Sequence, residues 1–232
     1  MQLFKCEFPD VNPANWLDPH RDRYVQSKGH CVEALYVVLA DKGFFPEEDL
    51  LTLCQYNSPY IGHPTKAVPG IEQNTGGLGH GLSLCCGMAL IAKKDQLPTK
   101  VFTVLGDGEM AEGSNWEALM FAAHYQLDNL CAILDYNKLQ ITGPNAQVMG
   151  LEPLADKIRA FGWAVKEVDG HNLDELETTF KSLPLKAGQP SFIIAHTTKG
   201  KGVSFMENSV KWHHGVPSQE QLDQALTELS HA

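Results

Sequence analysis

Long apolar runs, internal repeats and low-complexity tracts are missing from this sequence of 232 residues. The longest apolar run, residues 82–92, contains a serine and a glycine and is too short to cross a bilayer. The first residues lack the long apolar stretch of a secretory signal, so no signal peptide is expected. The sequence therefore predicts no membrane partner and a cytoplasmic location.

Basic residues are scarce relative to acidic ones. Lysine and arginine together number 18 against 28 aspartates and glutamates, which gives a formal net charge of −10. A nucleic-acid partner is not expected, because binding a phosphate backbone requires a basic face. A small anionic ligand remains open, since helix N-termini and a bound metal supply local positive charge.

Paired cysteine motifs are also lacking. The six cysteines are Cys6, Cys31, Cys54, Cys85, Cys86 and Cys131. They form no Cys-x-x-Cys pair and no zinc-binding spacing, and most of them lie in apolar runs. Buried, reduced thiols in a cytoplasmic protein are the expected state.

What the sequence does contain is an alternation of β-rich and helical segments. Strands are predicted at 101–105, 130–134, 163–168 and 191–195, and helices at 31–41, 79–94, 114–126, 153–161, 173–182 and 218–230. Ser114, Asn172 and Ser218 are candidate helix N-caps. This order predicts an α/β fold in which helices flank both faces of a parallel β-sheet. With 43% hydrophobic residues, residues 1–232 are expected to form a single domain.

An acidic residue between two glycines follows the first of the buried strands. Asp107 lies in Gly106-Asp107-Gly108, and Asn137 follows the next predicted strand. Ligands of parallel sheets bind at the carboxyl ends of strands, where two such oxygen donors would lie together and suit Mg²⁺ shared with a phosphate. Either residue alone is more typical of an ordinary Asx turn, but the pair at this spacing favours a metal and phosphate site.

A glycine-rich segment, Thr75-Gly76-Gly77-Leu78-Gly79-His80-Gly81, opens the helix predicted at 79–94. Bare backbone amides at a helix start can cradle an anion. A dinucleotide-binding fingerprint is disfavoured, because no convincing strand precedes these glycines. A simple packing turn remains an equal alternative for this segment taken by itself.

Histidines recur beside glycine or proline in three predicted loops. They are His30 in Ser-Lys-Gly-His, His63 in Gly-His-Pro, and His213 with His214 in Trp-His-His-Gly. Imidazoles suit contacts to phosphate and sugar hydroxyls and can carry a proton near pH 7. A lone loop histidine is more often simply solvated, so these residues gain meaning only together with the other motifs.

Taken in order, these motifs resemble the transketolase family from about residue 21 to residue 217. The glycine segment matches the family's diphosphate loop except at Gly77 and His80, where the family has proline and glutamine. The resemblance implies the thiamine diphosphate-binding fold, with thiamine diphosphate and Mg²⁺ as cofactors. It also implies that the metal ligands are Asp107, Asn137 and the backbone carbonyl of Leu139.

The same resemblance assigns the remaining site residues. Contacts to the cofactor are implied for His30, Gly76, Gly77, Leu78, Gly108, Asn137, Lys199 and His213. Catalytic roles are implied for His63 near the substrate hydroxyls, for His213, and for Glu112 at a subunit interface. Spacing from Lys199 selects His213 over His214. For Glu112, a favourable interaction with the start of a helix is an alternative.

The chain resembles the N-terminal half of a transketolase made as its own subunit, and its sequence starts after a family segment whose histidine touches substrate. The resemblance implies transfer of a two-carbon ketol unit from a ketose to an aldose, usually as sugar phosphates. A separate subunit with the pyrimidine-binding domain would supply the activating glutamate, and a heterotetramer is expected. Alternatives are a non-catalytic paralogue that binds the cofactor, a deoxyxylulose-phosphate synthase or 2-oxoacid dehydrogenase subunit, or a nucleotide-binding Rossmann protein.

Overall fold

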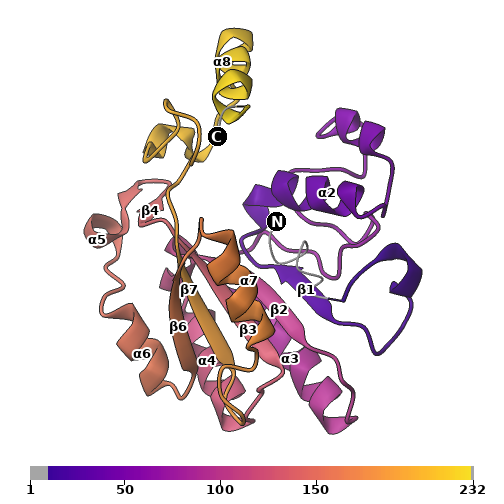
Figure 1. Cartoon of the computed structure of the whole chain (residues 1–232), viewed down its shortest axis with the longest axis vertical. Helices are drawn as coiled ribbons and strands as arrows, with labels where there is room; N and C mark the ends of the chain where they lie inside the picture. Colours follow the sequence, from indigo (N-terminus) through magenta and orange to yellow (C-terminus); the bar gives the residue numbers. More distant parts are fainter. Residues whose placement is uncertain (1–9, 231–232) are drawn as a thin grey trace.

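The structure is a computed structural model that describes residues 10–230; the predicted buried thiol of Cys6 lies outside this range. Five parallel strands form the main sheet in the order β1-β2-β3-β7-β6 (Figure 1). They are β1 (Arg23–Gln26), β2 (Val101–Gly106), β3 (Leu130–Tyr136), β6 (Ala164–Asp169) and β7 (Ser191–His196). Two short strands, β4 (Leu139–Gln140) and β5 (Gly143–Pro144), pair separately as an antiparallel ribbon.

The central strands are apolar on both faces, as parallel strands covered on two sides must be. In β3, Leu130, Ala132 and Leu134 belong to one buried cluster, whereas Cys131 and Ile133 belong to the other. Successive side chains of a strand point to opposite faces, so this run supplies two separate cores at once.

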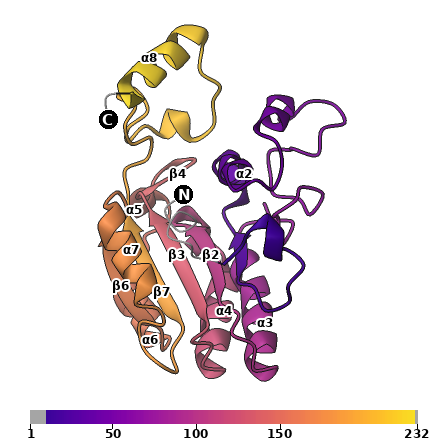
Figure 2. The same cartoon turned by 45° about the vertical axis from the view of Figure 1, so that its right-hand side comes forward.

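Helices close both cores, which confirms the predicted fold class. The first cluster takes residues from α3 (Gly81–Lys94), α4 (Gly113–His124) and α6 (Leu154–Ala160). The second takes residues from α2 (Val32–Asp41) and α7 (Leu173–Lys181). Figures 1 and 2 show α3 and α4 side by side on the face opposite α7.

Every predicted strand and helix is present, but β1 was not predicted. It has only four residues, and the buried polar Gln26 ends it, so neither length nor hydrophobicity marks it. Pairing with β2 stabilises it, with Gln26 opposite Val104. Unpredicted shorter helices are η1 (Pro13–Asn15), η2 (Gly29–Cys31), η3 (Glu47–Thr52), η4 (Gly108–Ala111), α5 (Asn145–Val148) and η5 (Val210–His213).

Two of the three predicted helix caps are confirmed. Asn172 accepts a hydrogen bond from the backbone of Glu175, and Ser218 forms a capping box with Gln221 at the start of α8 (Gln219–Leu229). The prediction for Ser114 is wrong, because α4 begins one residue earlier and Glu112 is its N-cap. The Ser114 hydroxyl instead donates to the carbonyl of Gly79, 2.8 Å away.

The thiols are buried only where their element faces a core. Cys85 and Cys86 in α3 and Cys131 in β3 are free and buried, as predicted. Cys31 is half-buried and Cys54 is exposed, so the prediction of burial is wrong for Cys54, which lies in a loop after η3.

Figure 1 shows α8 beyond the carboxyl edge of the sheet, on the side where the loops after β2 and β3 lie. In residues 10–230, no helix has the length and apolar character needed to traverse a bilayer.

Candidate cofactor and metal site

Four loops meet at the carboxyl edge of the sheet, after β1, β2, β3 and β7. The register brings them to one level: Gly106 pairs with Asp135, and Tyr136 pairs with His196. The motifs found in the sequence occupy these loops, so residues far apart in the chain become neighbours. This edge is where ligands bind in folds of parallel strands.

Asp107 holds the loop after β3 against the loop after β2. One carboxylate oxygen accepts from the amide of Gly108 at 2.7 Å, and the other accepts from the amide of Lys138. Asn137 stands beside this contact, and its side-chain oxygen accepts from the amide of Leu139 at 3.0 Å. The structure therefore brings together the three residues predicted as metal ligands.

The Asp107 carboxylate is only 2% exposed, and its charge is poorly solvated. Burial raises its pKa above the usual value, although the two backbone hydrogen bonds partly offset this effect. A cation beside the carboxylate would favour its ionised form. Within residues 10–230 there is no cluster of three or more His, Cys, Asp or Glu suited to a metal. A single carboxylate with neutral oxygen donors instead suits Mg²⁺, which completes its shell with phosphate oxygens and water.

The glycine loop, residues 75–81, packs against the loop after β1 and against His63. The hydroxyl of Thr75 donates to the carbonyl of Gln26 at 2.7 Å. A Cβ added at Gly76 would lie 2.5 Å from the His63 ring, so only glycine allows this approach. His63 is thereby placed beside the predicted diphosphate loop.

The cationic cluster comprises Lys28, His30, His63, Lys199 and His213. The rings of His30 and His213 stack with centroids 5.4 Å apart, although 183 residues separate them in the chain. Burial, followed by the charges of Lys28 and Lys199, lowers the pKa of His30. Burial and then Lys199 lower the pKa of His213 to about 4.

Burial is the larger cause of both shifts, and the positive charges of Lys28 and Lys199 beside the two rings add to it, in a protein whose net charge is −10. An anion at this position would relieve their mutual repulsion. His213 adds a second sign of a missing partner, because its buried Nδ1 has no hydrogen-bond partner among the described residues. His214 is exposed, whereas His213 is half-buried and stacks on His30. The residues present fit a diphosphate ligand bound through a divalent cation.

Sequence reasoning missed Lys28 and Asp135. Their side chains form an ion pair, with Lys28 Nζ 2.5 Å from Asp135 Oδ2, between the ends of β1 and β3. Burial alone would lower the pKa of Lys28, but the Asp135 carboxylate raises it above the usual value. The available signal was positional: Lys28 lies two residues before His30, and Asp135, near the end of β3, lies two residues before Asn137.

Glu112 and the Asp169–His171 segment lie outside the cationic cluster. Glu112 is exposed at the start of α4, where it touches the glycine loop: a Cβ at Gly79 would lie 2.6 Å from Glu112 Cβ. The His171 ring accepts from the amide of Thr198, and the His171 amide donates to Asp169, so the chain turns at the end of β6.

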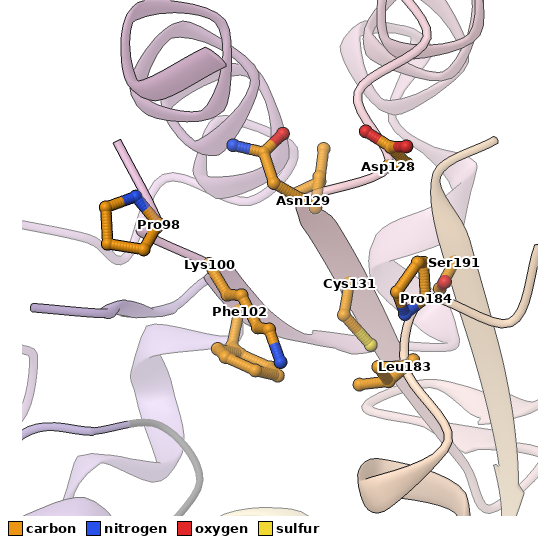
Figure 3. Close-up of a pocket in the computed structure, with 10 residues that line it drawn as sticks. Pro98, Lys100, Phe102, Asp128, Asn129, Cys131, Leu183, Pro184 and Ser191 are labelled. Atoms are coloured by element: carbon orange, nitrogen blue, oxygen red, sulfur yellow. The ribbon is translucent and has the colours of Figure 1, made fainter. Parts of the chain in front are cut away.

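A pocket of about 230 Å³ lies at the opposite, amino edge of the sheet (Figure 3). It is lined by side chains at the starts of β2, β3 and β7 and by the loop around Leu183 and Pro184. None of the predicted site residues lines this pocket, so the pocket and the candidate site lie at opposite ends of the strands.

Comparisons with known proteins all point to one family. Residues 2–230 match the family model described as transketolase, thiamine diphosphate binding domain. One subunit of the apulose-4-phosphate transketolase of Phocaeicola vulgatus is 53% identical over 90% of this chain and 75% of its own length. One subunit of the 6-deoxy-6-sulfo-D-fructose transketolase of Clostridium sp. is 45% identical over 94% of this chain and 80% of its own length.

Solved structures give the same result. Transketolase from Leishmania mexicana superimposes with a TM-score of 0.87 and 28% identity over 98% of this chain. The chain spans 36% of the length of that enzyme, so it corresponds to about a third of a single-chain transketolase.

Proposed function

The chain belongs to the transketolase family, and from that membership we propose that it is the diphosphate-binding subunit of a transketolase built from two kinds of chain. The observation that carries the proposal is that Asp107 lies close enough to Lys28 and Lys199 of the cationic cluster to affect their pKa values, at one edge of the sheet. Relatives of similar extent, which this chain matches over 75% and 80% of their length, are themselves transketolase subunits.

In this proposal Mg²⁺ is held by Asp107, Asn137 and the carbonyl of Leu139. The diphosphate is bound by loop amides and by the imidazole and ammonium groups around it: His30, Gly76, Gly77, Leu78, Gly108, Asn137, Lys199 and His213. Support comes from the raised pKa of Asp107, whose carboxylate a cation would stabilise, and from the positive charges of Lys28 and Lys199 beside His30 and His213, which an anion would stabilise. Bound thiamine diphosphate supplies the nucleophilic carbon and the electron sink that cleavage next to a ketone requires.

His63 and His213 act on the substrate side of this anchor. At pH 7 the His213 imidazole is neutral, because its pKa is about 4, and it can accept or hand on a proton at Nδ1 once an anion or hydroxyl lies nearby. The contact between His63 and Gly76 keeps that imidazole next to the diphosphate loop. Glu112, exposed beside the same loop, is proposed to lie at a subunit interface.

The proposed reaction is transfer of a two-carbon ketol unit from a ketose, usually phosphorylated, to an aldose. The names of the relatives point to ketoses that carry a phosphate or sulfonate group. The proposed partner is a separate subunit with the pyrimidine-binding domain and the activating glutamate, assembled with this chain as a cytoplasmic heterotetramer. The subunit naming of the relatives supports a partner of this kind.

The test is a ketol-transfer assay on the chain alone and on the chain co-expressed with a candidate partner. Activity is expected only with the partner, and full activity of the chain alone would overturn the two-chain proposal. Pyruvate consumption with release of carbon dioxide would instead indicate a different enzyme of this cofactor class.

A paired substitution tests the anchor. Asp107→Ala should abolish Mg²⁺-dependent binding of thiamine diphosphate in the assembled enzyme, measured by titration calorimetry. Asp169→Ala, the same change at the last residue of β6 and outside the site, should leave binding unchanged. Tight Mg²⁺-dependent binding by the Asp107 variant would refute the role given to that carboxylate.

A further inference from the structure

Glu109 is a buried carboxylate that connects three segments of the site. It lies in η4, directly after Gly106-Asp107-Gly108, and is 2% exposed. Its Oε1 accepts from the amide of Gly79 at 2.9 Å and from the hydroxyl of Ser27. Its Oε2 accepts from the amide of Gly106 at 3.0 Å. One side chain thus joins the glycine loop, the end of β1 and the end of β2.

The donors are all uncharged, which is unusual for a buried carboxylate. None of the ion pairs formed within residues 10–230 includes Glu109. A buried charge is costly without compensating hydrogen bonds, and here three donors provide the compensation. A buried charge gives no packing advantage over an apolar side chain, so we look for the role of Glu109 in the segments that it holds in place.

What Glu109 holds is the peptide of Gly79. The amide of this residue donates to Glu109, and its carbonyl accepts from Ser114. Gly79 has φ +85°, and an added Cβ would lie 2.5 Å from the Ser114 hydroxyl, so the loop is pressed against the start of α4. The glycine loop is thereby locked to the segment that carries Asp107.

We propose that Glu109 is the positioning residue that sets the diphosphate loop, residues 75–81, in register with the metal ligand Asp107. The inference rests on the proposed function, since it concerns how the diphosphate loop and Asp107 bind the same Mg²⁺-diphosphate. The orientation of a backbone amide is not set by its own side chain. Because the diphosphate loop and Asp107 lie on different loops, a rigid contact between them is needed to fix their relative positions. Glu109 provides that link through its two oxygens.

Glu109→Gln tests the link with little change in size. An amide has one acceptor oxygen, so it can receive either the Gly79 and Ser27 donors or the Gly106 donor. The other position then sets an NH₂ group against an N–H group. A buried donor left unpaired weakens a site about ten- to a hundredfold. The affinity of the assembled enzyme for thiamine diphosphate at fixed Mg²⁺ should fall by that factor, while kcat at saturating cofactor stays near the original value.

A second readout does not depend on activity. In the full chain without cofactor, amide hydrogen exchange within residues 75–81 should speed up about tenfold or more in Glu109→Gln. Exchange in α7, on the other face of the sheet, should not change. Should the glutamine variant fail to fold, Ser27→Ala removes a single neutral donor and should weaken cofactor affinity a few-fold.

Ser191→Ala is the matched control for general destabilisation. Ser191 is buried, and its hydroxyl accepts from the amide of Leu185 at 3.0 Å, at the amino edge of the sheet beside the pocket of Figure 3. Its loss should lower stability without altering cofactor affinity. Wild-type affinity and loop exchange in Glu109→Gln or Ser27→Ala would overturn the positioning role. An equal loss of affinity in Ser191→Ala would also overturn it.

The two proposals fail in different ways. If Glu109→Gln binds normally while Asp107→Ala does not bind, the positioning role falls and the proposed function stands. If the unaltered assembled enzyme does not bind thiamine diphosphate with Mg²⁺, the proposed function itself falls.

Discussion

Replacement of Lys28 by methionine would test how the loops at the carboxyl edge are held together. The lysine reaches from the end of β1 across β2 to Asp135 at the end of β3. It passes over Gly106, where an added Cβ would lie 3.7 Å from Lys28 Cβ. Methionine keeps most of the apolar stem but removes the charge, so Asp135 loses its cation.

The expected loss is about 2–3 kcal/mol in the free energy of unfolding. Removing one partner of a fully buried ion pair typically costs about 3–5 kcal/mol. The side chain of Lys28 is 13% exposed, but that of Asp135 is 30% exposed and still accepts from Thr197. Water and the remaining donor therefore compensate part of the lost interaction, which places the loss below that range.

The effect of pH follows from the two pKa shifts. The pKa of Asp135 is lowered overall. Burial by itself would raise this pKa, but Lys28 and the hydrogen bonds to the carboxylate together lower it by more. Its contribution to stability is present above its unfolded pKa and is lost as pH falls through the lowered value. The raised pKa of Lys28 makes its contribution full below its unfolded pKa, and the contribution is lost as pH rises through the raised value. The difference between the variant and the original chain should be constant from about pH 5 to pH 9 and shrink in stronger acid.

Urea unfolding of the full chain at several pH values measures this difference, and a double-mutant cycle with Asp135→Asn isolates the pair. The two changes together should cost less than the sum of the single losses by about 1–3 kcal/mol. Lys201→Met, which breaks an exposed contact of 4.0 Å to Glu207, should change stability by less than about 0.5 kcal/mol. A Lys28→Met variant as stable as the original chain would refute the reasoning.

Three further predictions concern the affinity of histidine variants, proton uptake on cofactor binding, and the glycine loop. His213→Gln should weaken cofactor affinity about tenfold and His214→Gln by less than about twofold, because only His213 stacks on the site; equal losses would reverse the assignment. Since the His213 pKa is about 4 and an anion beside it would raise that value, cofactor binding should take up protons near pH 5, as seen by calorimetry in buffers of different ionisation enthalpy. Gly79→Ala should destabilise the chain in thermal unfolding, because its Cβ would overlap the start of α4 at a φ of +85°, whereas Gly87→Ala, with nothing within 4 Å, should stabilise α3 by up to about 1 kcal/mol.

The fold was predictable from the sequence because its central strands are apolar over their whole length. The runs that became β2 and β3 bury both faces, as a parallel sheet covered on two sides requires. The strand β1 was missed because its stability comes from pairing with β2 and not from its own four residues. The cap at Ser114 was predicted wrongly because a distant carbonyl, that of Gly79, competes for its hydroxyl.

The candidate site was predictable only where a residue type has few uses. Asp107 between two glycines, Asn137 after a strand, and histidines in glycine loops carry such signals, and the family resemblance that they supported is confirmed. Their roles in binding remain predictions. Lys28, Asp135 and Glu109 carried no comparable signal, since lysine, aspartate and glutamate are common in loops and at helix starts.

The sequence alone determined the four longer strands and the six longer helices, that the sheet is parallel, and which loops carry the candidate site residues. Local apolar patterns and turn-forming residues act over a few positions, so they can be recognised in the sequence itself. Tertiary structure alone decided that Glu109 would link three loops, that Lys28 would reach Asp135, and that the rings of His30 and His213 would stack. These contacts join residues 30 to 183 positions apart, and only the parallel register of the strands brings them within a few ångströms.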